Sequence, residues 1–102
     1  MSWEGEYISF GYPEAVKSVS IFKGIKLINY TENHQKYWEA HYDKQKNVLI
    51  REWGRVGNAP QHKEESCSVV EAVVKIEKLV LDKYTKGYRT EEENLKFLLN
   101  KS

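Results

Sequence analysis

Apolar and polar residues alternate along three stretches in the first two thirds of the chain, and a turn after the third places a fourth, polar stretch beside it, so we predict four β-strands. The stretches cover residues 21–30, 37–43, 47–57 and 61–67. Three short segments rich in polar residues, Gly or Pro separate them, at residues 31–35, 43–47 and 57–60. Connections this short favour hairpins, so we expect neighbouring strands to pair antiparallel.

After residue 67 the apolar spacing changes to three and four, which predicts an α-helix. Ser68 and Glu71 have the spacing of a capping box, in which each side chain satisfies the other residue's backbone N–H. The apolar stripe of this helix consists of Val69, Ala72, Val73, Ile76, Leu79 and Val80. Gly87 suits the left-handed backbone that ends many helices. We expect the helix to lie across one face of the sheet and to leave the other face more open.

A second capping box, from Thr90 to Glu93, predicts a short C-terminal helix. The predicted fold class is therefore α+β: a small twisted antiparallel sheet of about four strands packed against one long helix, with a short C-terminal helix. A chain of 102 residues is near the usual size of one domain, which we place at residues 21–102. Residues 1–20 are rich in aromatic side chains, so we expect this N-terminal extension to pack on the domain or to meet a partner.

The end of the third stretch is the strongest candidate for a binding site. Alternation puts Arg51 and Trp53 on one side, and Arg55 follows between Gly54 and Gly57, where we expect a bulge or a turn. An indole beside planar guanidinium groups suits a ligand with a ring or sugar next to a phosphate. The structural alternative is a Trp that belongs to the core or its rim. Because an unpaired Arg is costly to bury, we predict that Trp53 is at least partly exposed and lies beside Arg51.

The sequence Trp-Gly-Arg at residues 53–55 resembles the signature of the WGR domain, a module of several poly(ADP-ribose) polymerases and of small bacterial proteins. Residues 36–39 resemble the second strand of that family, and residues 61–67 occupy the place of its next strand. Gly87 and Tyr88 match the residue pair that ends the family's helix. The resemblance covers residues 25–90, and its specificity comes from the order of these elements around the triplet.

In the polymerases, WGR domains contact DNA at strand breaks, where the motif Trp packs on the end of the nucleic acid. The motif Arg makes polar contacts there or with a neighbouring domain. The resemblance thus implies a nucleic-acid-binding site at Trp53, Gly54 and Arg55. Strand geometry and charge add Arg51 and Lys36 to this site.

The expected partner is DNA, at broken or nicked ends or along the phosphate backbone, or RNA, bound without sequence specificity. The alternative is a protein–protein interaction module that uses the same Trp-Gly-Arg surface. A chain of 102 residues has no room for the catalytic domain of a polymerase, so we expect binding without the signalling role.

The charges are unevenly distributed, although the whole chain carries only +1. Residues 23–63 hold eight Lys or Arg and four Asp or Glu, a net charge of +4, which leaves −3 for the remainder. Such asymmetry favours an anionic partner on the sheet side, and ordinary solvated faces explain it equally well.

No catalytic constellation is evident in the sequence. His34, His41 and His62 lack metal-ligand spacing with one another or with Cys67, so we expect no enzyme activity, no cofactor and no metal. Cys67 is either slightly acidified by the helix start or, as we favour, a small buried residue. No apolar run approaches the ~20 residues of a membrane span, and the N-terminus has no secretory pattern. We expect a cytoplasmic protein, nucleoid-associated in a bacterium or nuclear in a eukaryote.

Overall fold

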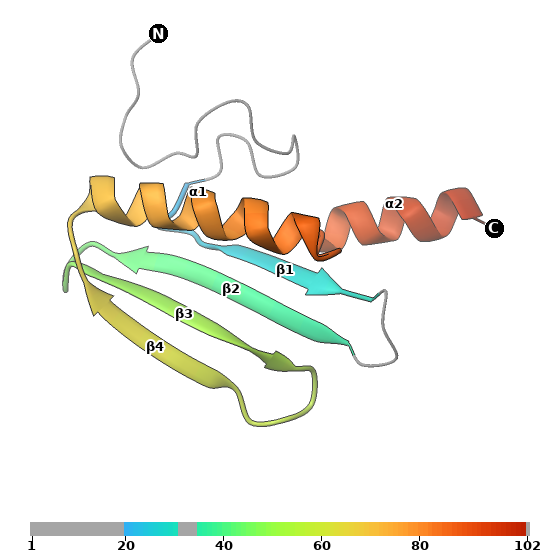
Figure 1. The fold of residues 1–102 in the computed structure, drawn as a ribbon, viewed down its shortest axis with the longest axis horizontal. Coiled ribbons are helices and arrows are strands. Elements are labelled where there is room, and N and C mark those ends of the chain that lie inside the picture. The colour runs from blue at the N-terminus through green and yellow to red at the C-terminus, as the bar shows by residue number, and fades with distance from the viewer. Residues whose placement is uncertain (1–19, 31–34, 102) are drawn as a thin grey trace, which may run out of the picture.

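The computed structural model describes residues 20–30 and 35–101 of the chain (Figure 1). The elements are β1 (Ile25–Asn29), β2 (Lys36–Asp43), β3 (Val48–Arg55), β4 (Gln61–Ser66), α1 (Val69–Thr85) and α2 (Glu91–Lys101). The strands form one antiparallel sheet in the order β1-β2-β3-β4. The predicted fold class, α+β with one long and one short helix, is confirmed. The prediction that the N-terminal extension packs on the domain concerns residues 1–20, of which residues 1–19 lie outside the described residues.

The core lies between α1 and one face of the sheet. Cross-strand partners share a face, so the register that pairs Leu27 with Trp38 and Tyr42 with Leu49 aligns their side chains under the helix. The core cluster of buried apolar residues consists of Ile21, Ile25, Leu27, Trp38, Ala40, Tyr42, Leu49, Ala72, Val73, Ile76, Val80 and Tyr88. Tyr42 keeps its hydroxyl satisfied by donating to the backbone oxygen of Cys67 at 2.7 Å.

Both ends of α1 have the geometry that the sequence predicts. The Glu71 N–H donates to the Ser68 hydroxyl oxygen at 3.2 Å, and the Ser68 N–H donates to the Glu71 carboxylate at 3.0 Å. The hydrogen bond from the Ser68 backbone lowers the pKa of Glu71. At the other end Gly87 has φ +98°, and the chain turns so that Tyr88 is only 9% exposed in the core.

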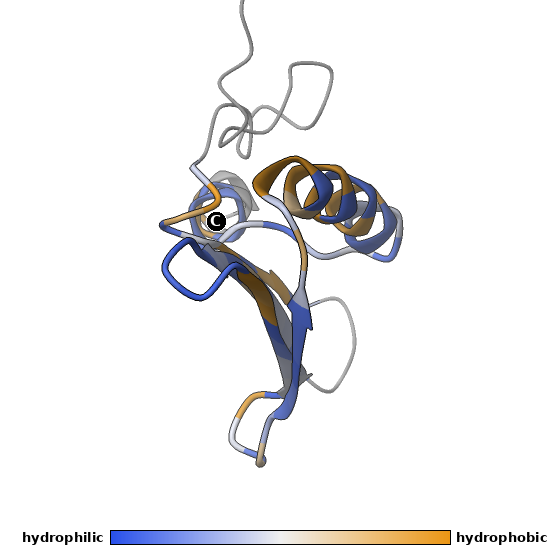
Figure 2. Ribbon diagram, turned by 90° about the vertical axis from the view of Figure 1, so that its left-hand side faces the viewer, coloured by the Kyte–Doolittle hydropathy of each residue, from blue (hydrophilic) through white to orange (hydrophobic). Residues whose placement is uncertain are grey.

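The helix α1 crosses the sheet diagonally and covers only part of it. It begins directly after β4, and the chain that follows it pairs with β1 through the Ile28 N–H and the Arg89 oxygen at 2.8 Å. The β3–β4 half of the sheet therefore extends beyond the helix (Figure 1). Figure 2 shows that this half is largely hydrophilic, whereas the sheet under the helices is apolar. Because it crosses diagonally, α1 leaves part of this face of the sheet, over β3 and β4, without a helix above it.

We predict that Ser68→Ala lowers the free energy of unfolding by ~1 kcal/mol, the usual cost of losing an N-cap. The backbone N–H of Glu71 would lose its acceptor, whereas the backbone N–H of residue 68 would still donate to the Glu71 carboxylate. Urea unfolding measures the change, with Ser66→Ala at the exposed end of β4 as the control. If Ser68→Ala leaves both the midpoint and the slope unchanged, Ser68 is not the cap in solution.

Candidate nucleic-acid interface

The predicted site residues lie on the helix side of the sheet, on neighbouring strands. In the β2–β3 register, Lys36 lies opposite Arg55, Trp38 opposite Trp53, and Ala40 opposite Arg51. Because cross-strand partners point the same way, Lys36, Arg51, Trp53 and Arg55 share the face that α1 partly covers. Arg51, Trp53 and Arg55 follow one another along β3 toward the end of the sheet that α1 leaves uncovered, where Lys36 lies beside Arg55.

Gly54 lets the strand continue to Arg55 without a break. A φ of +151° favours glycine, yet Gly54 still pairs with Tyr37 in β2. The expected bulge is therefore absent along β2, and the expected turn begins after Arg55. There the Asn58 N–H donates to the Arg55 oxygen at 3.1 Å, and Gly57 has φ +94°.

Trp53 is partly buried at the edge of the core. Its cross-strand partner on one side is Trp38, which is 2% exposed, and its partner on the other side is Gln61 in β4. The prediction that Trp53 is at least partly exposed is confirmed, and alternation along β3 puts Trp53 on the same face as Arg51. Part of the indole thus belongs to the rim of the core, and part remains available for contact.

Arg51 is held by a carboxylate rather than standing free beside Trp53. Its Nη2 donates to Glu65 Oε1 at 3.3 Å, and its side chain is 16% exposed. Glu65 also pairs with Lys75 of α1, so one carboxylate joins two cations. Among the described residues, the Arg51 Nε is a buried polar atom that has no hydrogen-bond partner. Glu65 was not predictable from local sequence patterns, because only the pairing between β3 and β4 brings it next to Arg51.

Arg55 is in the opposite situation. It is exposed, and it forms no ion pair with any residue that the structure describes. Lys36 lies directly across from it, so two positive charges face each other at the strand end. Lys36 already takes part in another interaction, so among the described residues Arg55 is the cation of this pair that remains available.

A cleft of about 310 Å³ separates α1 from the β3–β4 half of the sheet. It is lined by Arg51, Lys63, Glu65, Lys75, Lys78 and Leu79. Of these residues, only Arg51 was placed in a binding site from the sequence. Lys63 was detectable in principle, because a short hairpin places it opposite Arg51. Nothing in the helical spacing identified the flank of α1 that faces β4.

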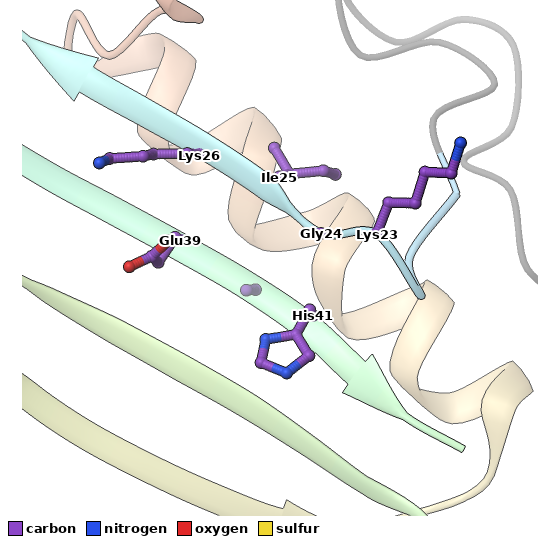
Figure 3. Close-up of a pocket in the computed structure, with 7 residues that line it drawn as sticks. Lys23, Gly24, Ile25, Lys26, Glu39 and His41 are labelled. Carbon is purple, nitrogen blue, oxygen red and sulfur yellow. The ribbon is translucent and has the colours of Figure 1, made fainter. Parts of the chain in front are cut away.

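The opposite face of the sheet carries a mixed set of charges. A smaller hollow of about 130 Å³ lies there beside Gly24, between Lys23, Lys26, Glu39 and His41 (Figure 3). Gly24 has φ +92°, and a Cβ added to it would lie 3.0 Å from that of His41. The hollow combines both signs of charge in a small space, so it is a weaker candidate for an anion.

Further along the face of the sheet opposite α1, His62 lies between two carboxylates. Its Nε2 is 2.9 Å from Glu64 Oε2, and its Nδ1 is 3.4 Å from Glu52 Oε2. The hydrogen bond to Glu64, and then that to Glu52, raise the pKa of His62 against the opposing effect of desolvation. Burial likewise raises the pKa of the Cys67 thiol, which favours a packed residue over an acidified one. Within the described part of the chain, no three His, Cys, Asp or Glu side chains gather as metal ligands would.

We predict that Glu64→Gln lowers the pKa of His62, because the variant removes the larger of its two favourable contacts. A raised pKa means that His62 stabilises the fold below its unfolded pKa and loses this effect as the pH rises through the folded pKa. An NMR titration of the imidazole protons measures the shift, with Glu91→Gln on α2 as the control. A His62 pKa that is equal in both variants would show that the contact with Glu64 does not persist in solution.

Comparison with known proteins supports the resemblance found in the sequence. The family model described as the WGR domain matches residues 24–95, which include all four strands and α1. Neither a search of curated proteins nor one of solved structures gave a match. In the described part of the chain, neither helix is both long and apolar enough to span a bilayer. Since the matched region is well over half of the chain, the protein belongs to the WGR domain family.

Proposed function

We propose that this protein is a non-enzymatic nucleic-acid-binding module. Its ligand would be DNA, at ends or along the phosphate backbone, recognised without sequence specificity. The proposed contact residues are Lys36, Arg51, Trp53, Gly54 and Arg55. The same surface fits RNA, because phosphates and base faces are common to both nucleic acids.

The exposed guanidinium of Arg55 is the observation that carries the proposal. A planar guanidinium offers paired donors that match two phosphate oxygens, and no described carboxylate occupies those donors. Arg55 ends β3, and its backbone oxygen accepts from the Asn58 N–H in the turn that follows. Its Cα is therefore fixed while its side chain remains available. Lys36 adds a second positive charge directly opposite.

Trp53 would supply a stacking surface two residues before Arg55. Its inner part packs against the core, which holds the ring in place. An immobilised ring loses little rotamer freedom on binding, so stacking with a base or a terminal sugar costs less entropy. Gly54 links the two residues with a φ of +151°, a backbone conformation that favours glycine.

Phosphate contacts and stacking do not read base identity, which is why we propose binding without sequence specificity. The overall charge of +1 limits long-range attraction, so the contacts would be local to this part of the sheet. For nucleic-acid binding of this kind, log K falls linearly as the logarithm of the salt concentration rises, because binding releases counterions.

A protein–protein interaction module is the second candidate. Val56, next to Arg55, is 52% exposed, and a Trp and an Arg beside an exposed apolar residue resemble the hot spots of protein interfaces. Titration with blunt, nicked and single-stranded oligonucleotides at several salt concentrations separates the two candidates. Affinity that falls steeply with salt supports the nucleic-acid proposal, and no binding at low salt would favour a protein partner.

We predict that Arg55→Ala weakens oligonucleotide binding about ten- to a hundredfold while leaving the fold intact. Losing a charge-assisted hydrogen bond costs roughly 1.5–3 kcal/mol, and each 1.4 kcal/mol is about a factor of ten. Lys46→Ala is the matched control, because Lys46 is exposed on the β2–β3 hairpin, at the opposite end of these strands. Lys78 is unsuitable for this purpose because it lines the cleft. Equal losses in the Arg55 and Lys46 variants would contradict the site.

We predict that Trp53→Ala reduces affinity by a similar factor, since stacking contributes roughly 1–3 kcal/mol per base. Unlike Arg55→Ala, it should also lower the unfolding midpoint, because Trp53 packs on the core rim. Binding is therefore measured at a temperature where urea unfolding shows each variant fully folded. If both residues hold one ligand, the double variant loses less affinity than the two single variants combined. Strict additivity would argue against a shared ligand.

A further inference from the structure

The geometry points to a second phosphate-binding site in the cleft between α1 and the β3–β4 half of the sheet. This inference rests on the proposed function, because the phosphate would belong to the same nucleic acid that contacts Trp53 and Arg55. The residues that would hold it are Arg51 and Lys63 from the sheet and Lys78 from the helix.

The charges that line the cleft are strongly unbalanced. Four cations face it, Arg51, Lys63, Lys75 and Lys78, against the single carboxylate of Glu65. Glu65 is already shared between Arg51 and Lys75. Lys63 and Lys78 form no ion pair with any described residue, so their charges remain uncompensated within the cleft. An oxyanion is the ligand that this excess of positive charge favours.

Arg51 provides a donor that is already oriented. Its Nη2 is fixed by Glu65 at 3.3 Å, while its buried Nε has no acceptor among the described residues. A buried donor left without a partner destabilises the fold. An anion at the cleft wall, directly or through one bound water, would satisfy this donor at the cost of a small side-chain shift. The ion pair with Glu65 keeps the guanidinium in place for that contact.

The size and location of the cleft fit a phosphate of the proposed ligand. Its 310 Å³ lies at the lower end of the about 300–1,000 Å³ typical of ligand pockets. Arg51 and Arg55 are four residues apart on β3, about 13 Å at the usual rise of a strand. One strand of duplex DNA has a phosphate every about 3.4 Å of axis, so a ligand held at Arg55 reaches the cleft within about four nucleotides.

The backbone of α1 diverges from β4 between these two positions (Figure 1). The helix α1 and β4 are joined at residues 67–68 and diverge from there, so the wedge between them widens toward the end of the sheet that carries Arg55 (Figure 1). Trp53 lies between Arg51 and Arg55 along β3 and is partly exposed. A single nucleic-acid strand would thus contact the cleft, the indole and Arg55 in succession.

The test compares two charge-matched double variants of the full chain. Lys63→Ala with Lys78→Ala empties the cleft of its unpaired cations and leaves the ion pairs of Arg51 and Lys75 with Glu65 untouched. Lys46→Ala with Lys96→Ala removes two exposed cations elsewhere. Affinity for a duplex and for a single-stranded oligonucleotide is measured against salt. For the cleft variant, we expect the slope of log K against log salt concentration to become shallower by about one unit for each phosphate contact removed. The control should keep the wild-type slope.

A second measurement separates a backbone phosphate from a free one. Pyrophosphate is titrated into the wild type and both variants, and NMR follows the amide signals of residues 51 and 63 and the Nε–H of Arg51. Shifts in the wild type and the control, but not in the cleft variant, would show that the cleft takes a phosphate group. Oligonucleotide binding with unchanged affinity in the cleft variant would then assign the site to free phosphates.

The outcomes of the two proposals are distinguishable. Suppose that the wild type binds oligonucleotide and that Arg55→Ala weakens this binding. If the cleft variant then binds as tightly as the control, and pyrophosphate shifts no signals, the cleft inference is wrong and the proposed function stands. If the wild type binds no oligonucleotide, the proposed function fails, and only pyrophosphate shifts at Arg51 and Lys63 would retain the cleft as a phosphate site. The absence of those shifts would overturn it in that case too.

Discussion

The register between β2 and β3 is the constraint on which the rest of the structure depends. It pairs Trp38 with Trp53 and Lys36 with Arg55, so the core and the candidate site lie on one continuous face. A slip of one residue would turn every side chain of β3 to the opposite face. Leu49 would then leave the core, and Arg55 would leave the neighbourhood of Lys36. Core packing therefore also fixes the arrangement of the cations, and the candidate site needs no separate scaffold.

The composition of β4 explains why the helix leaves half of the sheet uncovered. Its six residues are Gln61–Ser66, and none of them is apolar, so this strand offers nothing that α1 would gain by covering. The apolar side chains of β1 and β2 draw the helix to the other half instead. Since the capping box anchors the start of α1 just after β4, the helix must cross the sheet diagonally. The wedge is a direct consequence of these two requirements.

The sequence predicted those features that depend on local periodicity. Alternation located the first three strands, and the turn before β4 located the fourth. The Ser68 and Glu71 pair located the start of the helix, and the glycine at residue 87 located its end. Features that depend on which distant segments meet were not predictable in this way. The partner of Arg51 is Glu65, which is fourteen residues further along, and only the β3–β4 register brings the two together.

The flank of α1 that carries Lys75 and Lys78 was hidden from sequence reasoning for a related reason. Helical spacing identifies the apolar stripe but does not reveal what lies beside the helix once it is docked. Gly54 shows a different limit. Two nearby glycines suggested a bulge, yet a φ of +151° is extended enough for the strand to stay paired with Tyr37. Glycine permits an unusual conformation without dictating which one occurs.

The two arginines of β3 illustrate how position decides what a charge can do. Arg55 is exposed, so water and salt screen it, and its side chain must lose rotamer freedom to hold a ligand. Arg51 is mostly buried and already fixed by Glu65, so it has lost that freedom during folding. Exposed charges mainly influence how fast partners associate, and buried, hydrogen-bonded charges mainly influence how slowly they separate. A ligand spanning both would be captured near Arg55 and retained near Arg51, which gives two residues of one type on one strand different physical roles.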